Sequence, residues 1–544
     1  MVQINAEDFL QELRFDIQEK DRIKAKLVLA QLKNVDEVTR KQALQELGRA
    51  DNHFAVPLML DLMVKERDLS DQYPDLKEGL YAKAFESPQL FVDLLMREMR
   101  QEYRRLLVET VGEIGLTQAM PVLVGILNEE QDEEILRAVI RALGAFGDLS
   151  VTTSISEYLY SGSVTLIIAA IQALGQLESP TAIQRLFEKL GADHDLDTLI
   201  LDVLARSQVP DAIEKLNETL TSHHAHVRNL GKQHLVQIGS KAVPLLMRNL
   251  LRDDPDVLIH TLNVLGEIGD EAAIGAIRKL LHNEPRDPNV RFAAYEALGR
   301  LPVAKGAITL AAGLQDPVDN VRTVAASAIN SNYNRVLAAG LKNMVRESGA
   351  EARRVVTAVV DAQCDSVFKD LMEMPAFREM ATRYINEEVH AEVRTFFLPL
   401  LKVQPLSEAV SETTDSTADD APAKQKIYAV DDSKMILNIY RSVLHKLGYE
   451  PVLFEFPLQA IEQVRQDKPA IILTDLNMPK INGIDLIRQV RQWFDKDQLP
   501  IIMVTTQNEC QDNEEAHQAG VNRILNKPFT EKSIGQAIAE VQTV

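Results

Sequence analysis

The chain has 544 residues, 46% of them hydrophobic and only 5% aromatic, so it is long enough for several domains with aliphatic cores. The formal net charge of −21 argues against a nucleic-acid binder, because proteins that hold phosphate backbones need an excess of Lys and Arg. Cys364 and Cys510, the two cysteines, lie far apart in the sequence and support neither a disulfide framework nor a zinc cluster.

The first residues, MVQINAEDFLQELRFDIQEK, lack the basic-then-apolar layout of a signal peptide. The most apolar run, from Val164 to Leu174, is too short to cross a bilayer and is interpreted as a buried helix. Together with the scarcity of cysteine, these features predict a cytoplasmic protein with no membrane insertion.

Residues 1–403 are predicted to form an all-α array of repeats. Apolar runs end in similar short motifs, such as VGEIG around Gly112, LGAFGD at Gly144 and LGEIGD at Gly266. Equivalent positions recur about every 31 residues, which is typical of a stacked repeat array, whereas an ordinary helical bundle has no reason to keep a fixed period. The full set of equivalent positions is Gly112, Gly144, Gly175, Ala205, Val236, Gly266, Gly299, Asn330 and Asp361.

Each unit is predicted to contain two amphipathic helices. In VRFAAYEALGRL the apolar residues from Val290 to Leu301 have the spacing of one buried helical face. After Gly269, Asp270 can cap a second helix in EAAIGAIRKLL. Prolines fall near the starts of the equivalent helices, where the missing N–H is not needed; they are Pro121, Pro180, Pro210 and Pro244.

An Arg stands at the same distance before the repeat marker in many units, and an acidic residue often precedes it. This pattern resembles HEAT repeats, in which an Asp and an Arg hydrogen-bond between neighbouring units. The resemblance covers most of residues 30–403, with irregular units around 50–100 and 362–392, and implies a solenoid whose concave face binds an unknown protein partner. The arginines are Arg40, Arg104, Arg228, Arg291, Arg322, Arg353 and Arg394, and the acidic residues are Asp36, Asp287 and Asp319.

Residues 404–425, QPLSEAVSETTDSTADDAPAKQ, have neither a helical stripe nor strand alternation. Their Ser, Thr, Asp, Ala and Pro cannot bury enough apolar surface to offset the entropy lost on ordering. The segment is therefore predicted to be a flexible acidic linker between two parts of the chain.

Residues 426–544 change to short apolar strands alternating with amphipathic helices. This alternation predicts an α/β doubly wound, flavodoxin-like domain with five parallel strands and helices on both faces. The strands are expected at 426–430, 450–455, 470–475, 500–505 and 523–527, and the helices near 434–447, 458–466, 484–493, 511–519 and 530–541.

Polar residues stand at the carboxyl ends of these strands. Asp431 and Asp432 follow the first strand and Asp475 ends the third, so in the order 2-1-3-4-5 the three carboxylates converge. Crowded carboxylates raise one another's pKa unless a cation neutralises them, and oxygen ligands with room for water suit Mg²⁺. Thr505 and Lys527 end the fourth and fifth strands. A metal, an ammonium and a hydroxyl around one carboxylate suit the stabilisation of a transferring phosphoryl group.

Residues 426–544 resemble the receiver domain of bacterial response regulators, and DLNMPKINGIDLI and NKPFT are most similar to chemotaxis-type single-domain receivers. The resemblance implies that Asp475 is the phosphoacceptor and that a histidine kinase is the phosphodonor. It also implies that Asp432 is a direct Mg²⁺ ligand, that Asp431 supports the ion, and that the backbone carbonyl of Asn477 is a third protein ligand.

The resemblance further implies that Lys527 pairs with the acyl phosphate and that Thr505 moves to bond it. A cis peptide is expected before Pro528. Ile524 departs from the family, which usually has a Tyr or Phe at this position that moves inward with the Thr. Signalling is expected through the surface of the fourth helix, fifth strand and fifth helix.

Other motifs indicate no second catalytic centre. The chain has no G-x-x-x-x-G-K-[ST] loop, H-E-x-x-H helix or G-x-S-x-G elbow. His223, His224 and His226 could bind a metal, but they fall where the solenoid needs a turn and are interpreted as an exposed polar loop.

The favoured interpretation is a non-enzymatic signalling scaffold in which phosphorylation of Asp475 regulates protein binding by the array. In the alternative, the receiver is a phosphate sink that the array anchors to a kinase complex. A third hypothesis, that the array itself is an enzyme, has no supporting constellation of residues.

Overall fold

The computed structural model describes residues 5–65, 74–302, 307–389, 391–401, 424–478, 481–505, 510–527 and 529–542. These residues belong to two compact units, Met1–Ala212 and Ile213–Val544. No helix in the described ranges has both the length and the apolar character that a membrane span requires. Most of the predicted linker, and the expected cis peptide at Pro528, lie outside the described residues.

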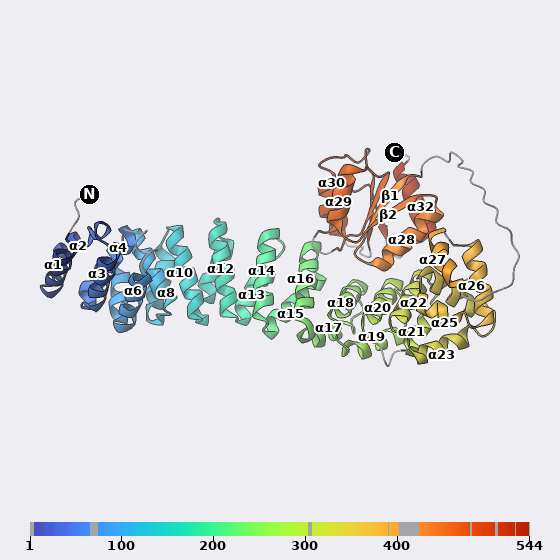
Figure 1. The fold of residues 1–544 in the computed structure, drawn as a ribbon, viewed down its shortest axis with the longest axis horizontal. Coiled ribbons are helices and arrows are strands. Elements are labelled where there is room, and N and C mark those ends of the chain that lie inside the picture. Colours follow the sequence, from blue (N-terminus) through green and yellow to red (C-terminus); the bar gives the residue numbers. More distant parts are fainter. Residues whose placement is uncertain are drawn as a thin grey trace. The chain divides into compact units, whose positions relative to one another are not determined.

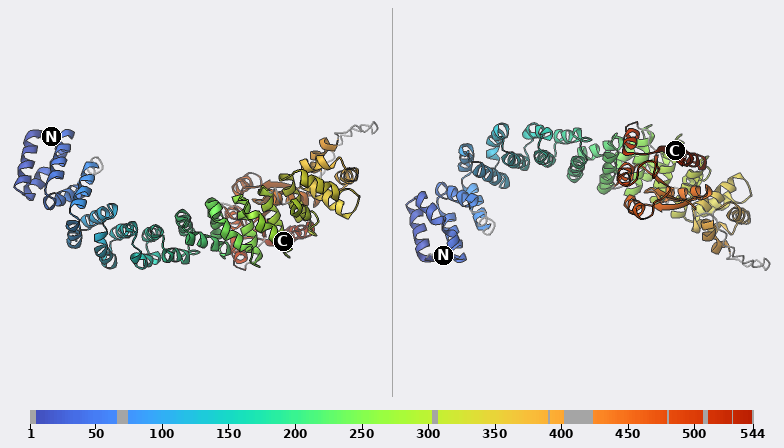
Figure 2. Two further views of the ribbon diagram at one scale, coloured as in Figure 1. Left: turned by 90° about the horizontal axis from the view of Figure 1, so that it is seen from below. Right: turned by 90° about the horizontal axis from the view of Figure 1, so that it is seen from above.

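The first unit consists of helices that stack side by side in chain order, as Figures 1 and 2 show. Short 3-10 turns at Leu32–Asn34, Thr117–Ala119, Leu149–Val151 and Glu157–Tyr160 lie between them. The α-helices are α1 (Ala6–Gln18), α2 (Arg22–Leu29), α3 (Glu37–Arg49), α4 (Asn52–Lys65), α6 (Pro74–Glu86), α7 (Pro88–Arg97), α8 (Gln101–Glu113), α9 (Met120–Glu129), α10 (Glu133–Phe146), α11 (Thr152–Ser156), α12 (Val164–Leu177), α13 (Pro180–Glu188) and α14 (His194–Ser207); α15 (Pro210–Glu218) begins at the end of this unit.

The marker glycines lie where equivalent helices of neighbouring repeats touch. A Cβ added at Gly112 of α8 would lie 2.7 Å from the Cβ of Ala142 in α10, and one added at Gly144 would lie 2.6 Å from the Cβ of Ala173 in α12. Real Cβ atoms do not approach this closely, so only glycine permits this helix spacing. The recurring motif of the sequence is therefore a packing motif.

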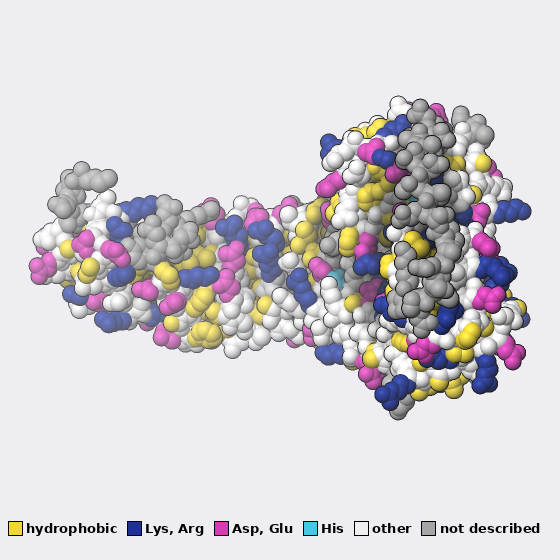
Figure 3. All heavy atoms as spheres, turned by 45° about the vertical axis from the view of Figure 1, so that its right-hand side comes forward, with side chains coloured by type: hydrophobic (Ala, Val, Ile, Leu, Met, Phe, Trp, Pro, Cys, Tyr) yellow, Lys and Arg dark blue, Asp and Glu magenta, His cyan; other side chains and the backbone are white. Residues whose placement is uncertain are grey.

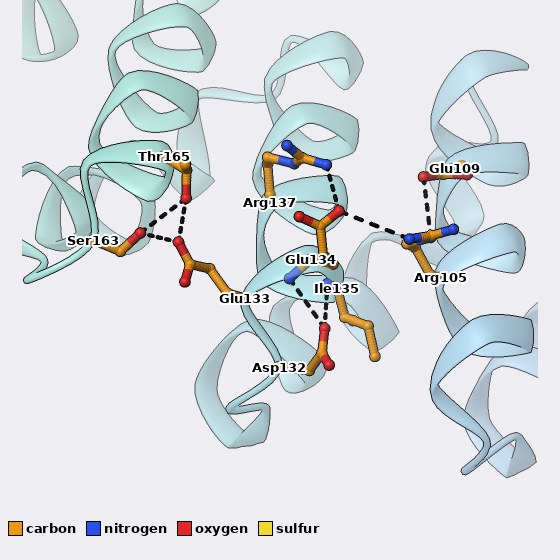
Figure 4. A network of polar contacts seen from close by, with 9 residues as sticks. All are labelled: Arg105, Glu109, Asp132, Glu133, Glu134, Ile135, Arg137, Ser163 and Thr165. Atoms are coloured by element: carbon orange, nitrogen blue, oxygen red, sulfur yellow. Dashed lines mark hydrogen bonds and ion pairs between the residues drawn. The ribbon is translucent and has the colours of Figure 1, made fainter.

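Polar contacts also tie neighbouring repeats together in the first unit (Figure 4). Asp132 caps α10 by accepting from the backbone N–H groups of Glu134 and Ile135, both at 3.0 Å. On the same helix, Glu133 accepts from the hydroxyl of Ser163 in the next repeat, while Glu134 lies 3.8 Å from Arg105 in the preceding one. One turn of α10 thus contacts both of its neighbours.

The second unit continues the helical pairs and then carries the α/β domain. It begins with 3-10 turns at Thr219–Thr221 and Gly239–Lys241 on either side of α16. Its helical repeats comprise α16 (Ala225–Ile238), α17 (Val243–Asn249), α18 (Pro255–Ile268), α19 (Ala273–His282), α20 (Pro288–Arg300), α21 (Ala307–Gly313), α22 (Asp319–Ser331), α23 (Arg335–Met344), α24 (Ala350–Asp361), α25 (Asp365–Leu371), α26 (Pro375–Glu387) and α27 (Ala391–Leu401).

Several of the repeat arginines bond the turn that precedes their own helix. Arg291 Nη1 donates to the carbonyl of Pro285 at 2.7 Å, and Arg322 Nη1 donates to that of Asp316 at 2.6 Å. Arg291 also reaches the next repeat, with its Nε 2.7 Å from Asp316 Oδ2. Asp287, in contrast, caps α20 through the backbone N–H of Asn289 at 2.7 Å. The inter-repeat Asp–Arg bond is thus made by Asp316, whereas Asp287 serves as an N-cap. Asp319 pairs with Arg322 of its own helix instead.

The remaining residues fold into a five-stranded parallel sheet in the order β2-β1-β3-β4-β5, as predicted. Its strands are β1 (Lys426–Val430), β2 (Glu450–Phe454), β3 (Ile471–Thr474), β4 (Ile501–Thr505) and β5 (Arg523–Asn526). Its helices are α28 (Lys434–Lys446), α29 (Pro457–Gln466), α30 (Gly483–Val490), α31 (Cys510–Ala519) and α32 (Glu531–Gln542). The third helix, α30, ends at Val490 and is therefore shorter than the predicted helix near 484–493.

Two apolar cores cover the two faces of this sheet, which Figure 1 shows between its helices. One core joins β-strand residues to α29, α30 and α31 and includes Ile487 and Ala516. The other joins the opposite face to α28 and α32 and includes Tyr440 and Ile538. Burial on both faces explains why the strands are continuously apolar.

Charged side chains of both signs lie interspersed over the part of the helical repeats visible in Figure 3. Several are neutralised locally. Lys342 lies 2.7 Å from Asp370 of the following repeat, and Lys26 lies 2.9 Å from Asp61. Such exposed pairs each contribute about 0–1 kcal/mol, so apolar burial dominates the stability of the array.

Candidate functional site

The register of the sheet brings the acidic strand ends together. Val430 pairs with Thr474, so Asp431 and Asp475 follow neighbouring strands at the same edge. The backbone N–H of Asp475 donates to the carbonyl of Val430 at 2.9 Å, which fixes the two strand ends against each other. On the other side, the N–H of Lys527 donates to the carbonyl of Thr505 at 2.8 Å. Four of the predicted site residues therefore stand along one rim.

Lys527 lies between the two acidic strand ends. Its Nζ is 2.7 Å from Asp431 Oδ2 and 2.9 Å from Asp475 Oδ1; both carboxylates are buried, and the Lys527 side chain is 11% exposed. Burial alone would lower the pKa of Lys527, but the carboxylates of Asp431 and Asp475 raise it well above its ordinary value. Lys527 therefore stays charged and holds the two strand ends together.

The protein raises the pKa of two of the acidic side chains, Asp431 and Asp432. Burial raises the pKa of Asp431. The charge of Lys527 lowers this pKa, whereas the charge of Asp475 raises it further. The surrounding protein also raises the pKa of Asp432, and the charges of Asp431 and Asp475 add to this effect. The side chain of Asp432 lines a cavity and is exposed to solvent, whereas those of Asp431 and Asp475 are buried. A site of this kind favours a cation that offsets the crowded negative charge.

Asn477 and Thr505 complete the predicted set. The backbone N–H of Asn477 donates to Asp475 Oδ2 at 2.9 Å, so the loop after β3 orients the carboxylate. Asn477 also lines the cavity. Thr505 is buried at the end of β4, directly opposite Asn526 of β5.

The oxygen donors do not form a closed cage as they stand. In the described part of the chain, no three His, Cys, Asp or Glu side chains converge closely enough to hold a metal ion. At the rim, Lys527 occupies the space between Asp431 and Asp475.

Gly483, at the start of α30, is a positioning residue that the sequence did not single out. A Cβ at this position would overlap the carbonyl group of Asp475, and the N–H of Gly483 donates to the carbonyl of Leu476 at 2.9 Å. The close approach of α30 to the end of β3 therefore requires glycine.

The rim faces a cavity of about 180 Å³ whose opposite wall is made of helical repeats in the same unit. The rim contributes Asp431, Asp432, Asp475 and Lys527 to the lining. The repeats contribute polar side chains from α16, α18, α20 and α22, among them Asn229, Lys232, His260, Asn289 and Asn320.

Two asparagines one repeat apart hold the loop after β5. Asn289 Nδ2 donates to the carbonyl of Lys527 at 2.8 Å, and Asn320 Nδ2 donates to that of Phe529 at 3.3 Å. Both stand in the tripeptide Asn-Val-Arg, which occurs at 289–291 and again at 320–322. The repetition of Asn at the same position of two adjacent repeats is the sequence signal for this surface.

Further contacts join the α/β domain to the repeats. Ser433 Oγ, at the N-cap of α28, donates to Glu296 Oε1 at 2.9 Å. Asn229 Nδ2 approaches the carbonyl of Met478 at 3.4 Å, and Ala225 belongs to the same apolar core as Met478. At the far end of α28, Arg441 lies 3.7 Å from Glu392 of α27.

The three histidines singled out in the sequence do not form a cluster in one loop. His223 and His224 lie in the turn before α16, whereas His226 lies inside that helix. The rings of His224 and His226 are 5.7 Å apart and tilted by 51°. The turn is where the repeat pattern predicted it.

Comparison with known proteins identifies both kinds of domain. The family model "Response regulator receiver domain" matches residues 427–539, and the family model "HEAT repeats" matches 88–168 and 243–330. Chemotaxis protein CheY1 of Helicobacter pylori is 36% identical over 118 residues, which are 21% of this chain and 95% of that protein. The CheY homolog of Campylobacter jejuni is 34% identical over 118 residues, which are 21% of this chain and 91% of that protein.

A search of solved structures also returned receiver domains. One is the receiver domain of the sensor histidine kinase PA1611 from Pseudomonas aeruginosa, described with a magnesium ion coordinated in its active-site cleft. It is 27% identical, with a TM-score of 0.22, and the match covers 22% of this chain and 100% of that chain. From the family match and the identity to the CheY proteins, the chain belongs to the response-regulator receiver family and is a two-component signalling protein in which HEAT repeats precede a receiver domain.

Proposed function

We propose that Asp475 accepts a phosphoryl group from a histidine kinase and that this modification regulates protein binding by the HEAT array. The observation that carries the proposal is the pairing of Lys527 with both Asp431 and Asp475 at the rim of a polar cavity. A buried ammonium beside an oriented carboxylate is suited to neutralise the charge that a phosphoryl group brings.

In the proposed transfer, a carboxylate oxygen of Asp475 attacks the phosphorus of a phosphohistidine. The new O–P bond forms as the N–P bond breaks, and the bonding electron pair of the N–P bond stays on the imidazole nitrogen, which then takes a proton. Lys527 pairs with the phosphoryl oxygens, and the Thr505 hydroxyl moves to donate to one of them. The Asn477 N–H, which donates to Asp475 Oδ2, orients the attacking carboxylate.

The donor set fits Mg²⁺, because carboxylate and carbonyl oxygens beside a polar cavity leave room for the water ligands that this ion retains. Asp432, Asp475 and the backbone carbonyl of Asn477 would hold the ion, with Asp431 supporting it. When bound, Mg²⁺ offsets the negative charge of the phosphoryl oxygens.

The proposed domain limits are 1–403 for the HEAT solenoid, 404–425 for a flexible linker and 426–544 for the receiver. The proposal is supported by the elements on either side of the segment, since α27 ends at Leu401 and β1 begins at Lys426. An unknown protein partner is proposed for the concave face of the solenoid.

Affinity capture from cell extract tests this function. Full-length protein is used with Mg²⁺, with and without beryllofluoride, a mimic of the phosphoryl group, and Asp475→Asn serves as the acceptor-less control. We expect at least one partner to appear or disappear with the mimic in the wild-type protein and to be unaffected by it in the variant. An identical partner set in both states would contradict regulated binding and favour the phosphate sink.

A further inference from the structure

Lys232 of α16 is a second ammonium group facing the proposed acceptor. It lines the same cavity as Asp432, Asp475 and Lys527, although it belongs to a HEAT repeat. Burial lowers the pKa of Lys232, and the charges of Asp432 and Asp475 oppose this effect. The ammonium of Lys232 therefore interacts electrostatically with the acidic end of the receiver across the cavity.

The charges around the cavity leave Lys232 available for an added anion. Glu267 and Glu296, the carboxylates that the repeats contribute to the lining, lie 3.8 Å and 3.3 Å from nitrogens of Arg300. On the receiver side, Lys527 is already shared between Asp431 and Asp475. Among the described residues, no carboxylate lies within ion-pair distance of Lys232 Nζ, so its charge is not committed to a close partner.

Phosphorylation would add charge to this cavity. A carboxylate with one negative charge becomes an acyl phosphate that carries close to two, so the site gains roughly one negative charge. The cavity of about 180 Å³ has room for a phosphoryl group between the receiver rim and α16. The added charge would therefore lie between Lys527 on one side and Lys232 on the other.

The cavity wall also offers a hydrogen-bond acceptor, the side-chain oxygen of Asn229. Asn229, one turn before Lys232, is 7% exposed and lines the cavity. Its Nδ2 points to the carbonyl of Met478, but within the described part of the chain its Oδ1 has no hydrogen-bond partner. A buried acceptor of this kind suits a water molecule that accompanies a phosphoryl group or a cation.

We propose that Lys232 is a phosphoryl-binding residue supplied by the HEAT array, so that phosphorylation of Asp475 tightens the contact of the receiver with α16, α18, α20 and α22. This inference rests on the proposed function, because it requires Asp475 to be the acceptor. The ligand recognised by the array is then the phosphoryl group on the chain's own receiver.

Hydrogen exchange of the full-length protein tests the inference. Beryllofluoride is titrated in the presence of Mg²⁺, and amide protection is followed over Ala225–Lys232 and around Phe529, where the receiver meets the repeats. We expect protection to increase in the wild-type protein. In Lys232→Gln the midpoint of the titration should rise by roughly tenfold, the effect expected for one partly buried ion pair. Lys232→Arg should titrate like the wild type because it keeps the charge.

Lys279→Gln is the matched control, since Lys279 is exposed on α19 and does not line the cavity. The inference is overturned if Lys232→Gln titrates like the wild type and Lys279→Gln, or if beryllofluoride decreases protection. Phosphorylation of Asp475 by acetyl phosphate is measured in parallel by intact mass. A wild-type protein that takes no phosphoryl group contradicts the proposed function itself, whereas one that is phosphorylated but insensitive to Lys232→Gln contradicts only the role of Lys232.

Discussion

The orientation of Asp475 depends on a residue that has no side chain. Gly483 brings the start of α30 against the carbonyl of Asp475, while the N–H of Asn477 holds the carboxylate from the other side. In the proposed phosphoryl transfer, the attacking carboxylate has little tolerance for displacement, since misplacement by about 1 Å can reduce a rate by a hundredfold. The backbone around Asp475 is therefore as important as the charged groups that face it.

Replacing Gly483 with Ala is expected to destabilise the receiver by about 1–3 kcal/mol, because the new methyl group must displace backbone atoms. Denaturant unfolding followed by Trp493 fluorescence measures this, since Trp493 is the sole tryptophan and lies in the receiver. Gly535→Ala on α32 is the control, because there the nearest atom is a flexible methyl of Leu447 at 3.1 Å. Equal stability of the two variants would refute the packing role of Gly483.

For individual residues, the sequence predicted the receiver side of the cavity but not the side formed by the helical repeats. Asp431, Asp475 and Lys527 could be placed because strand ends in a parallel sheet gather at one edge. Lys232 and Asn229 could not, because a polar residue on a repeat helix has the same periodicity whether it meets water or another domain. The side chains that wall the cavity opposite Asp475 are therefore visible only in the structure.

At the scale of elements, helix spacing in the array depends on the marker glycines. The repeat motif, the two-helix units and the strand order were all predictable, because each follows from a local period of apolar residues. The contacts of individual polar groups were not. Asp287 caps its own helix and Asp316 makes the bond between repeats, a distinction that depends on loop geometry.

The variant Gly144→Ala should lower the thermal stability of the first unit by about 1–3 kcal/mol, since its Cβ would lie 2.6 Å from that of Ala173. The variant Gly125→Ala on α9 has open space around the new methyl and should gain up to about 1 kcal/mol from helix propensity. Circular dichroism melting of the two variants compares them directly. Stabilisation by Gly144→Ala would show that α10 and α12 can move apart without any loss of thermal stability.

A half-buried acid at the end of α24, Asp361, is expected to make the stability of the array depend on pH. The hydroxyl of Tyr384 in α26 donates to Asp361 Oδ1 at 2.9 Å, and burial raises the pKa of Asp361 from 3.8 to about 6. Because the folded state favours the protonated acid, this group contributes stability below about pH 3.8 that is lost as the pH rises through 6.

Asp361→Asn should therefore stabilise the protein by about 1–2 kcal/mol at pH 7.5 and by less at pH 5. Chemical denaturation at the two pH values gives the difference. Asp365→Asn should instead destabilise the protein, because a side-chain hydrogen bond from Lys369 lowers the pKa of Asp365 and thus favours its carboxylate in the folded state. A gain for Asp361→Asn that does not change with pH would exclude titration as its cause.

At the scale of the whole molecule, the receiver meets the array through backbone carbonyls as well as charges. Asn289 and Asn320 hold two carbonyls on either side of position 528, and they are equivalent residues of adjacent repeats. The spacing of the repeats is thus matched to the spacing of carbonyls along the loop after β5. Because hydrogen bonds are directional, this match gives the docked position a defined register that charge alone would not impose.

Loss of both asparagines is expected to weaken docking by roughly tenfold to a hundredfold, because each hydrogen bond contributes about 0.5–1.5 kcal/mol. Time-resolved anisotropy of Trp493 in the double variant Asn289→Ala, Asn320→Ala should show a faster rotational component than in the wild type. Asn343→Ala, on an exposed position of α23, is the control. Unchanged anisotropy in the double variant would mean that these bonds do not hold the receiver.

The asparagine pair and its carbonyl partners belong to one polypeptide. Docking between them is therefore a unimolecular equilibrium. Its position does not depend on how many copies of the protein a cell makes, in contrast to a receiver that must find a separate target by diffusion. A change in expression level would alter the number of signalling molecules but leave the docked fraction of each population the same. The response of a single molecule to its phosphodonor would then be insulated from variation in protein abundance.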